Sequence, residues 1–207
     1  LTSEPDALEM LSQPLTFLDA SWTVRSASFV ESGPLRAVAR VTAERAARDR
    51  ATNTDGAAAS ESASTETASI EIVLEADANR IEVTCRVRAR SVPPIVARVP
   101  MRHAIARALV GVPFASSMAA PGPGGSAARH RLYDWIAGTD GERGVAILGG
   151  DVGVVRVEPR VLSVESSNVD ADGVSVTRFA LLPFRQGAKR AGLAAQAAEY
   201  ATPFVAD

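Results

Sequence analysis

The sequence predicts an all-β protein, a large antiparallel β-sandwich with one C-terminal helix. Three observations predict this class. Most periodic stretches place hydrophobic residues at every second position, which is the period of a β-strand. Glycine, proline and short polar residues separate these stretches, as turns require. Strands do not alternate with helices, which excludes a parallel α/β barrel within the 207 residues and favours antiparallel sheets.

The first half of the chain is expected to supply a lead-in segment and several strands. Residues 1–21 form an irregular lead-in that packs on the edge of the sandwich domain, residues 22–207. In 80–90, the clearest strand, apolar residues alternate with polar ones, so Cys85 on the apolar face is expected to be a small buried hydrophobe. Strands are expected at 22–30, 35–42, 69–74, 80–90 and 95–99.

The segment 48–67 interrupts this series of strands. It consists mainly of small and polar residues without periodicity, so it cannot bury enough apolar surface to order itself. We expect a long mobile hairpin loop inserted at the surface, with a regulatory segment as the less favoured alternative.

The stretch 131–159 is predicted to be a β-meander around which the other strands are arranged. Tyr133 and Trp135 are two residues apart, so in an extended strand they point the same way. Residues 145–148 form a short apolar run that can be buried on both faces. Gly149-Gly150-Asp151 then offers the residues that a hairpin turn demands.

The remaining segments complete the predicted sandwich. Residues 104–114 fit either a short helix or a strand, and the prolines and glycines of 119–125 exclude regular structure. Two more strands are expected at 160–165 and 173–182. The alanine-rich segment 188–200 is the one expected helix, with a stripe formed by Leu193, Ala197 and Tyr200.

Composition and charge exclude several classes of function. The net charge of -2 gives no reason to expect nucleic acid or an anionic membrane as a partner. One cysteine excludes an internal disulfide, and no Cys/His cluster is spaced to bind a metal, so no cofactor is expected in this chain. No apolar run approaches the ~20 residues that cross a bilayer. Because the chain begins at Leu1, we expect it to be cut from a longer protein. The expected location of that protein is the cytoplasm.

Five segments in the same order resemble a known domain, although none is specific alone. They are Glu31-Ser32-Gly33-Pro34-Leu35-Arg36-Ala37, Ile81-Glu82-Val83, Val112-Pro113-Phe114, Trp135-Ile136 with Gly144 to Leu148, and Phe179 to Pro183. Together they resemble the C-terminal β-sandwich domain of family-38 glycoside hydrolases, the α-mannosidases. This implies a mutarotase-like supersandwich. Departures from the family pattern include Ala115 for a glycine, Val152 for a tyrosine, and Phe184 and Arg185 where a histidine commonly follows the last proline.

The resemblance implies a domain without catalytic residues of its own. The aspartate nucleophile and the zinc ligands of that family belong to an N-terminal catalytic domain, so zinc is implied there and not in this chain. The expected partners are that catalytic domain and a mannoside substrate. The expected function is to pack on the catalytic domain and to wall the sugar cleft of a retaining glycoside hydrolase.

Few side chains are candidates for contact with a sugar. Trp135, Tyr133 and His103 are weak candidates, because core packing explains the aromatics and a surface position explains His103. Asp134 and Asp140 could form an acid pair, although Asp140 suits a solvated turn. His130, between two arginines, is expected to be exposed on an edge strand.

Two other functions remain open. A stand-alone mutarotase-like sugar-binding or epimerase domain would need His103, His130 and a carboxylate such as Glu82 to converge for proton transfer. A carbohydrate-binding module would need coplanar exposed aromatics, and aromatic residues make up 5% of this chain.

Overall fold

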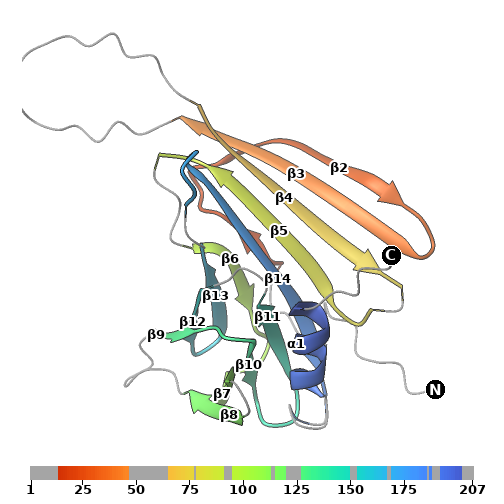
Figure 1. The fold of residues 1–207 in the computed structure, drawn as a ribbon, viewed down its shortest axis with the longest axis vertical. Coiled ribbons are helices and arrows are strands. Elements are labelled where there is room, and N and C mark those ends of the chain that lie inside the picture. Colours follow the sequence, from red (N-terminus) through yellow and green to blue (C-terminus); the bar gives the residue numbers. More distant parts are fainter. Residues whose placement is uncertain are drawn as a thin grey trace, which may run out of the picture.

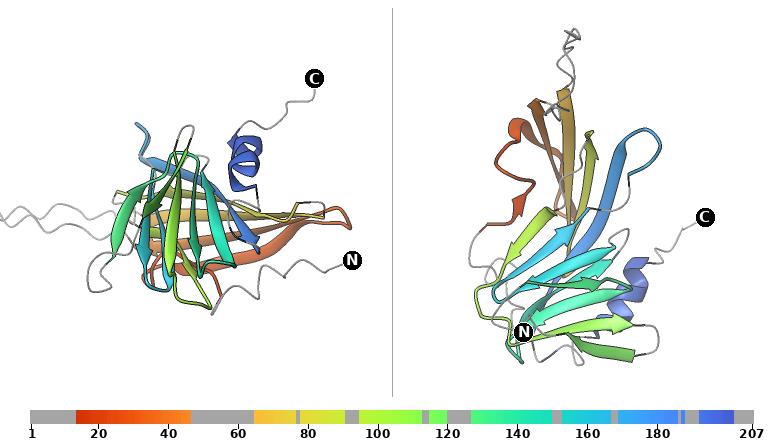
Figure 2. Two further views of the ribbon diagram at one scale, coloured as in Figure 1. Left: turned by 90° about the horizontal axis from the view of Figure 1, so that it is seen from below. Right: turned by 90° about the vertical axis from the view of Figure 1, so that its left-hand side faces the viewer.

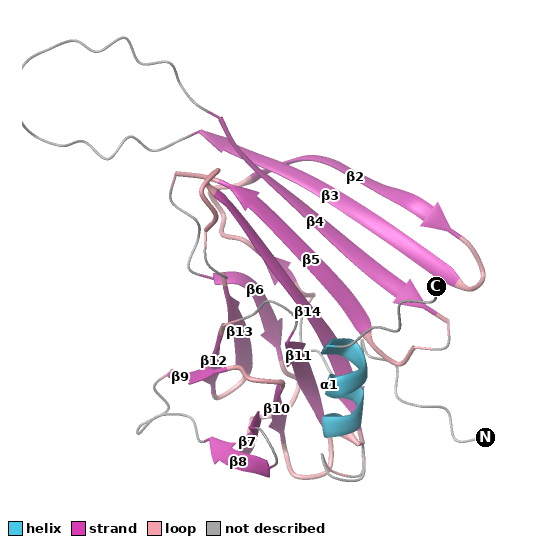
Figure 3. Cartoon of the chain, in the orientation of Figure 1, coloured by secondary structure: helices cyan, strands magenta, loops and turns pink. Residues whose placement is uncertain are grey.

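The structure is a computed structural model whose described residues form two antiparallel sheets and one helix (Figures 1 and 3). The description covers residues 14–46, 65–76, 78–90, 95–112, 115–119, 127–149, 153–166, 169–185, 187 and 192–201. Every strand pairing in these ranges is antiparallel. The predicted all-β sandwich with one C-terminal helix is therefore confirmed.

The two sheets differ in width. The larger has nine strands in the spatial order β2 (Thr23–Ser32), β3 (Arg36–Ala46), β4 (Thr65–Glu75), β5 (Ile81–Arg88), β14 (Val174–Phe184), β11 (Gly144–Gly149), β10 (Trp135–Thr139), β7 (Arg107–Val112) and β8 (Ala115–Ala119). The smaller has five strands in the order β1 (Thr16–Phe17), β6 (Ile95–Pro100), β13 (Val161–Glu165), β12 (Val154–Glu158) and β9 (Ala128–Arg131).

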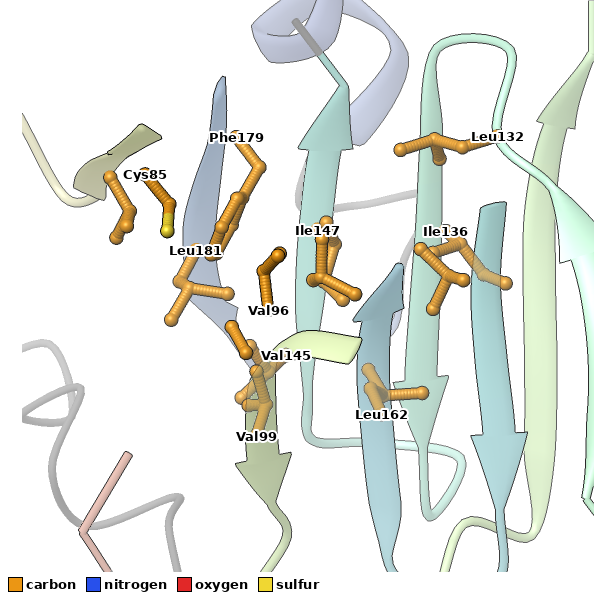
Figure 4. Close-up of a cluster of buried hydrophobic side chains, with 14 of the residues drawn as sticks. Cys85, Val96, Val99, Leu132, Ile136, Val145, Ile147, Leu162, Phe179 and Leu181 are labelled. Atoms are coloured by element: carbon orange, nitrogen blue, oxygen red, sulfur yellow. The ribbon is translucent and has the colours of Figure 1, made fainter. Parts of the chain in front are cut away.

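The main hydrophobic core lies between the two sheets (Figure 4). Alternation explains its composition, because every second residue of a strand projects to the same side. On β5, Val83, Cys85 and Val87 are each 1% exposed, as the pattern of 80–90 predicts. Leu162 and Val164 of β13, on the five-stranded sheet, belong to the same core and are 0% exposed.

A second apolar cluster lies on the outer face of the nine-stranded sheet, beneath helix α1 (Leu193–Ala201). Leu193 and Ala197 of the predicted helical stripe are buried there against Leu182 and Phe184 of β14. The helix begins at Leu193, and the prediction that Gly192 belongs to it is wrong, because the φ of 65° at Gly192 is left-handed and not helical. Residues 188–191 lie outside the described ranges.

The predicted meander over 131–159 is wrong in two places. Strands β10 and β11 do form a hairpin, but β11 pairs with β14 and β12 pairs with β13 and β9 in the other sheet. The chain thus passes from one sheet to the other after Gly149, and residues 150–152 of the predicted turn lie outside the described ranges. Strand β11 lies between β10 and β14 because its residues 145–148 are buried on both faces, and such a strand belongs in the middle of a sheet.

The second error concerns the two aromatic residues at the start of this stretch. Tyr133 and Asp134 form a bend between β9 and β10, so Tyr133 and Trp135 do not share a strand. Tyr133 is 55% exposed and Trp135 is 5% exposed. The assumption of a continuous extended strand through residue 133 caused the error.

All five strands predicted in the first half of the chain are confirmed, with changed ends. Strand β4 begins at Thr65, so residues 65–67 of the predicted loop 48–67 are strand, and the rest of that loop lies outside the described ranges. Glu66 is buried there and forms an ion pair with Arg45 of β3, a contact that the polar sequence of 48–67 does not reveal. The segment 104–114, which fitted either helix or strand, contains strand β7.

Strands β2, β3 and β4 extend away from the five-stranded sheet. Figure 1 shows them at the upper right, and the turned views of Figure 2 also place them at the end of the molecule opposite β7 and β8. We call these three strands the wing. The five-stranded sheet is narrower than the larger sheet, and the core between them still includes Ala68 and Ile70 of β4. Strand β2 lies beyond this core and is exposed along its whole length.

Candidate interaction surface

The inner face of the wing is an apolar surface that continues from the core to the sheet edge. In antiparallel strands, residues directly opposite one another project from the same face. One such row consists of Phe179, Val83, Ile72, Ala39 and Phe29, in order from β14 to β2. Exposure rises along it, from 1% at Phe179 and Val83, through the half-buried Ile72, to 73% at Phe29.

Neighbouring rows repeat this gradient. Leu74 of β4 is 46% exposed, while its opposite residue on β5, Ile81, is half-buried against the core. Val24 of β2 is 61% exposed in the row that ends at the buried Val87. We call Val24, Phe29 and Leu74 the wing face. The three residues lie in different rows of the same face, and exposed apolar residues gathered on one face mark a surface for another macromolecule.

The edge of the wing is shaped against strand-to-strand pairing. Strand β2 is the terminal strand of its sheet, and its pairing with β3 shifts register between Val24 and Ser26 and again between Phe29 and Glu31. Bulges of this kind bend an edge strand and interrupt its row of free hydrogen-bonding groups. The flat apolar face is therefore better suited for association than the strand edge.

A buried ion pair joins two strands of the wing, and its arginine also contacts residues that precede β2. Arg45 of β3 pairs with Glu66 of β4, and their side chains are 16% and 6% exposed. The guanidinium of Arg45 also lies 4.6 Å from the ring centroid of Trp22, and Glu66 accepts a hydrogen bond from the Arg90 N–H at 2.8 Å. Burial makes this pair costly to break, because Arg45 would keep only Asp19, at 3.9 Å, as a carboxylate partner.

The candidate Trp135 lies in the second apolar cluster. Its ring packs over Gly111 of β7 so closely that a methyl group at that glycine would overlap the indole. Tyr133 is exposed on the bend before β10, and its ring lies 6.0 Å from the guanidinium carbon of Arg131. The two aromatic residues therefore face different surroundings and do not form one platform.

The candidate His103 lies between β6 and β7, next to the turn that contains Asp140. Both residues line a small hollow of about 10 Å³, large enough for one water molecule. Asp140 accepts hydrogen bonds from the N–H groups of Arg143 at 2.8 Å and Glu142 at 3.0 Å. The pKa of Asp140 is lowered, mainly by the hydrogen bond from the backbone N–H of Arg143. The N–H of Glu142 and the charges of Arg143 and His103 lower it further. Asp140 therefore has the turn-forming role expected of it.

The three groups required for sugar mutarotation lie on different sides of the protein. Glu82 ion-pairs with Arg80, which also contacts Glu199 of α1, on the outer face of the nine-stranded sheet. His130 lies opposite the fully buried Val155, so it projects from the inner face of the five-stranded sheet. His130 does occupy an edge strand as expected, but it is half-buried and its Nε2 atom is buried without a hydrogen-bond partner.

Within the described ranges, no three His, Cys, Asp or Glu side chains gather to bind a metal ion. The zinc that the resemblance implies does not fit these residues and stays a prediction for a catalytic domain. Burial raises the pKa of the Cys85 thiol to about 12, which agrees with a buried hydrophobe and not a thiolate ligand. No helix in the described part of the chain is both long and apolar enough to span a membrane.

The sequence analysis did not identify the wing face. Val24 and Phe29 were read only as part of a strand, and a period of two does not distinguish a core from an interface. Their exposure depends on how many strands the opposing sheet has, and that number is set by pairings between distant segments. The only local signal is that large apolar side chains remain on a strand that lies at the sheet edge.

Comparison with solved structures finds this fold inside larger glycosidases. A family-38 glycosyl hydrolase from Enterococcus faecalis matches with a TM-score of 0.64 and 10% identity, over 89% of this chain and 25% of that chain. An α-mannosidase from Enterococcus faecalis V583 matches with a TM-score of 0.68 and 10% identity, over 89% and 24%. The family-36 α-galactosidase AgaA from Geobacillus stearothermophilus has a TM-score of 0.50 and 9% identity, over 84% and 30%.

Sequence comparison adds nothing to these matches, since no protein-family model and no curated protein matches this chain. The chain spans about a quarter of the length of the family-38 structures that it resembles. The resemblance stated from the sequence is therefore confirmed at the level of the fold: this chain has the fold of a β-sandwich domain present in family-38 α-mannosidases.

Proposed function

We propose that this chain is a non-catalytic domain of an α-mannosidase-type retaining glycoside hydrolase, which packs on the catalytic domain and forms a wall beside the sugar cleft. The wing face is the observation that carries this proposal. Its apolar residues continue the core towards the sheet edge, and the described part of the chain offers no second layer to cover them. A neighbouring domain of the same polypeptide supplies such a layer.

The energetics favour a stable contact of this kind. Burial of one large apolar side chain contributes about 1.5–3 kcal/mol, and the wing face presents Val24, Phe29 and Leu74 together. The bulged edge of β2 disfavours growth of the sheet into a second chain, so a face-to-face contact is preferred. The likeness to domains of family-38 hydrolases supports a catalytic domain as the partner.

The division of chemistry follows from the same view. The nucleophile and the zinc ligands of the hydrolase belong to its catalytic domain, and the mannoside is bound mainly there. This chain contributes surface and stability to the assembled enzyme. Several of its described ionisable groups form ion pairs between strands, such as the pairs of Arg40 with Glu71 and Arg129 with Glu165.

The test compares the isolated chain with the hydrolase that contains it. The isolated chain should fold, show no release of nitrophenol from nitrophenyl α-mannosides with added zinc, and leave the mutarotation rate of glucose unchanged in a polarimeter. The longer hydrolase should cleave the mannoside, and Phe29→Asp in it should lower the melting temperature more than in the isolated chain. Mannoside cleavage or accelerated mutarotation by the isolated chain would overturn the proposal.

A matched control separates the interface from general surface effects. Val169 is also an exposed apolar residue, at 47%, but it lies at an isolated bridge outside the wing. Val169→Asp should change the stability of the isolated chain and of the hydrolase equally. If Phe29→Asp and Val169→Asp behave alike in the hydrolase, the wing face does not contact the catalytic domain.

A further inference from the structure

A surface hollow of about 430 Å³ lies on the outer face of the nine-stranded sheet, on the side opposite the wing face. Its size falls in the range of small-molecule sites, roughly 300–1,000 Å³. Strands β3, β4, β5 and β14 contribute its lining, in which polar side chains predominate: Thr42, Glu44, Thr67, Ser69, Arg86 and Arg88.

The register of the strands explains why the sheet is hollowed at this point. Thr42, Ser69 and Arg86 lie directly opposite one another on the neighbouring strands β3, β4 and β5. The side chains on β3 and β4 are short, and the one on β5 is long. The next row contains the longer pair Arg40 and Glu71, which are joined by an ion pair of 2.7 Å. Short hydroxyl residues thus form a floor beside raised charged side chains.

The charge of the hollow is not balanced by its surroundings. Four other arginines of β2 and β3 each pair with a glutamate, namely Arg25, Arg36, Arg40 and Arg45. Arg86 and Arg88 of β5 form no ion pair within the described part of the chain. The one carboxylate in the lining, Glu44, already accepts a hydrogen bond from Arg25 at 2.8 Å. Two positive charges therefore face the same hollow.

The spacing of the two guanidiniums suits one anionic group with neighbouring hydroxyls. Residues two apart on a strand project from the same face at about 6.5–7 Å, so Arg86 and Arg88 reach the hollow together. Arginine binds a carboxylate through two parallel N–H donors. Thr42, Thr67 and Ser69 can each donate and accept, which suits a ligand rich in hydroxyls. The Thr42 hydroxyl is held in place by the Ser26 hydroxyl at 2.7 Å.

We propose that this hollow binds an acidic sugar, a hexuronic acid residue, with its carboxylate on Arg86 and Arg88 and its ring hydroxyls on Thr42, Thr67 and Ser69. A carboxylate is favoured because Arg86 and Arg88 have no ion-pair partner in the described part of the chain. The choice of a sugar rests on the proposed function, in which this chain is part of a glycosidase. No aromatic side chain lines the hollow, so binding depends on charge and is sensitive to salt.

The test measures binding by the isolated 207-residue chain, and it is therefore independent of any hydrolase activity. Trigalacturonate should bind at low salt and weaken as salt rises, while the neutral sugar mannotriose should bind at least about tenfold more weakly. Arg86→Gln with Arg88→Gln should reduce trigalacturonate affinity by about tenfold or more. Arg36→Gln, a change at an ion-paired arginine at the other end of the wing, should leave that affinity unchanged.

Three outcomes would overturn the proposal. Equal binding of trigalacturonate and mannotriose would exclude charge recognition. Inorganic phosphate that competes as well as the uronate at equal charge would show an adventitious anion site only. Binding that survives the double substitution would place the ligand elsewhere. Circular dichroism of each variant keeps the test valid, since both arginines are exposed and the variants are expected to fold.

Discussion

Removal of the Glu66 carboxylate is expected to destabilise the protein far more than removal of any exposed charge. Glu66 is 6% exposed, compensates Arg45, and accepts the Arg90 N–H at 2.8 Å. In Glu66→Ala the Arg45 guanidinium loses its nearest carboxylate and keeps Trp22 and the more distant, 54% exposed Asp19 as neighbours. Loss of one partner of a buried ion pair costs about 3–5 kcal/mol.

The size of this effect translates directly into a melting temperature. For a domain of roughly 150–250 residues, each 1 kcal/mol corresponds to about 2–4 °C. Glu66→Ala should therefore melt about 6–20 °C lower than the parent chain in a thermal scan followed by circular dichroism. The matched control is Glu71→Ala, which breaks the more exposed pair with Arg40 and should cost about 1 kcal/mol or less.

A double substitution separates the charge effect from lost packing. In Arg45→Met with Glu66→Leu both charges disappear and the apolar volume is retained, so stability should return to within about 1–2 kcal/mol of the parent chain. Equal melting temperatures for Glu66→Ala and Glu71→Ala would refute the reasoning, since burial would then have no energetic consequence. A double variant as unstable as Glu66→Ala would show that shape, and not compensation of charge, governs the site.

Three further predictions follow from the core and the turns. Gly111→Ala places a methyl group inside the Trp135 ring, and it should cost about 1–3 kcal/mol in urea unfolding; a neutral result would show that the ring moves freely. Cys85, with its pKa raised to about 12, should resist thiol reagents in the folded state at pH 8 and react after denaturation. Between about pH 9 and 12 the protein should lose stability, because the thiol ionises there in the unfolded chain but not in the folded one. The ionised carboxylate of Asp140 stabilises the fold at pH values above its ordinary pKa of about 3.9, and this stabilisation is lost as pH falls through the lowered pKa of the folded state. The difference in stability between the parent chain and Asp140→Asn should therefore disappear in acid. A difference that does not change with pH would contradict this role of Asp140.

Local patterns were sufficient to predict the fold class and many strands. The alternation of Ile81, Val83, Cys85 and Val87 identifies β5 and its buried face, because a strand covered on one side needs that period. The resemblance of five short segments also led to the correct fold. Turn residues were less reliable, since glycines after β11 fit a hairpin as well as a passage between sheets.

The features that depend on long-range pairing could not be predicted. The exposure of Phe29 is set by the width of the opposing sheet, and the burial of Glu66 is set by its register with Arg45 across a connection of 18 residues, 47–64. The arginine hollow has the same origin, because Thr42, Ser69 and Arg86 come together only through the pairing of three strands. A sequence pattern specifies a face of a strand but not what lies beside that face.

Amide hydrogen exchange over β2, β3 and β4 tests the central claim most directly. The measurement compares these strands in the isolated chain and in the glycoside hydrolase that contains it. If the wing face packs on the catalytic domain, the amides around Phe29 and Leu74 exchange more slowly in the hydrolase. Exchange at the same rate in both proteins would contradict the proposed packing and leave the wing face without its partner.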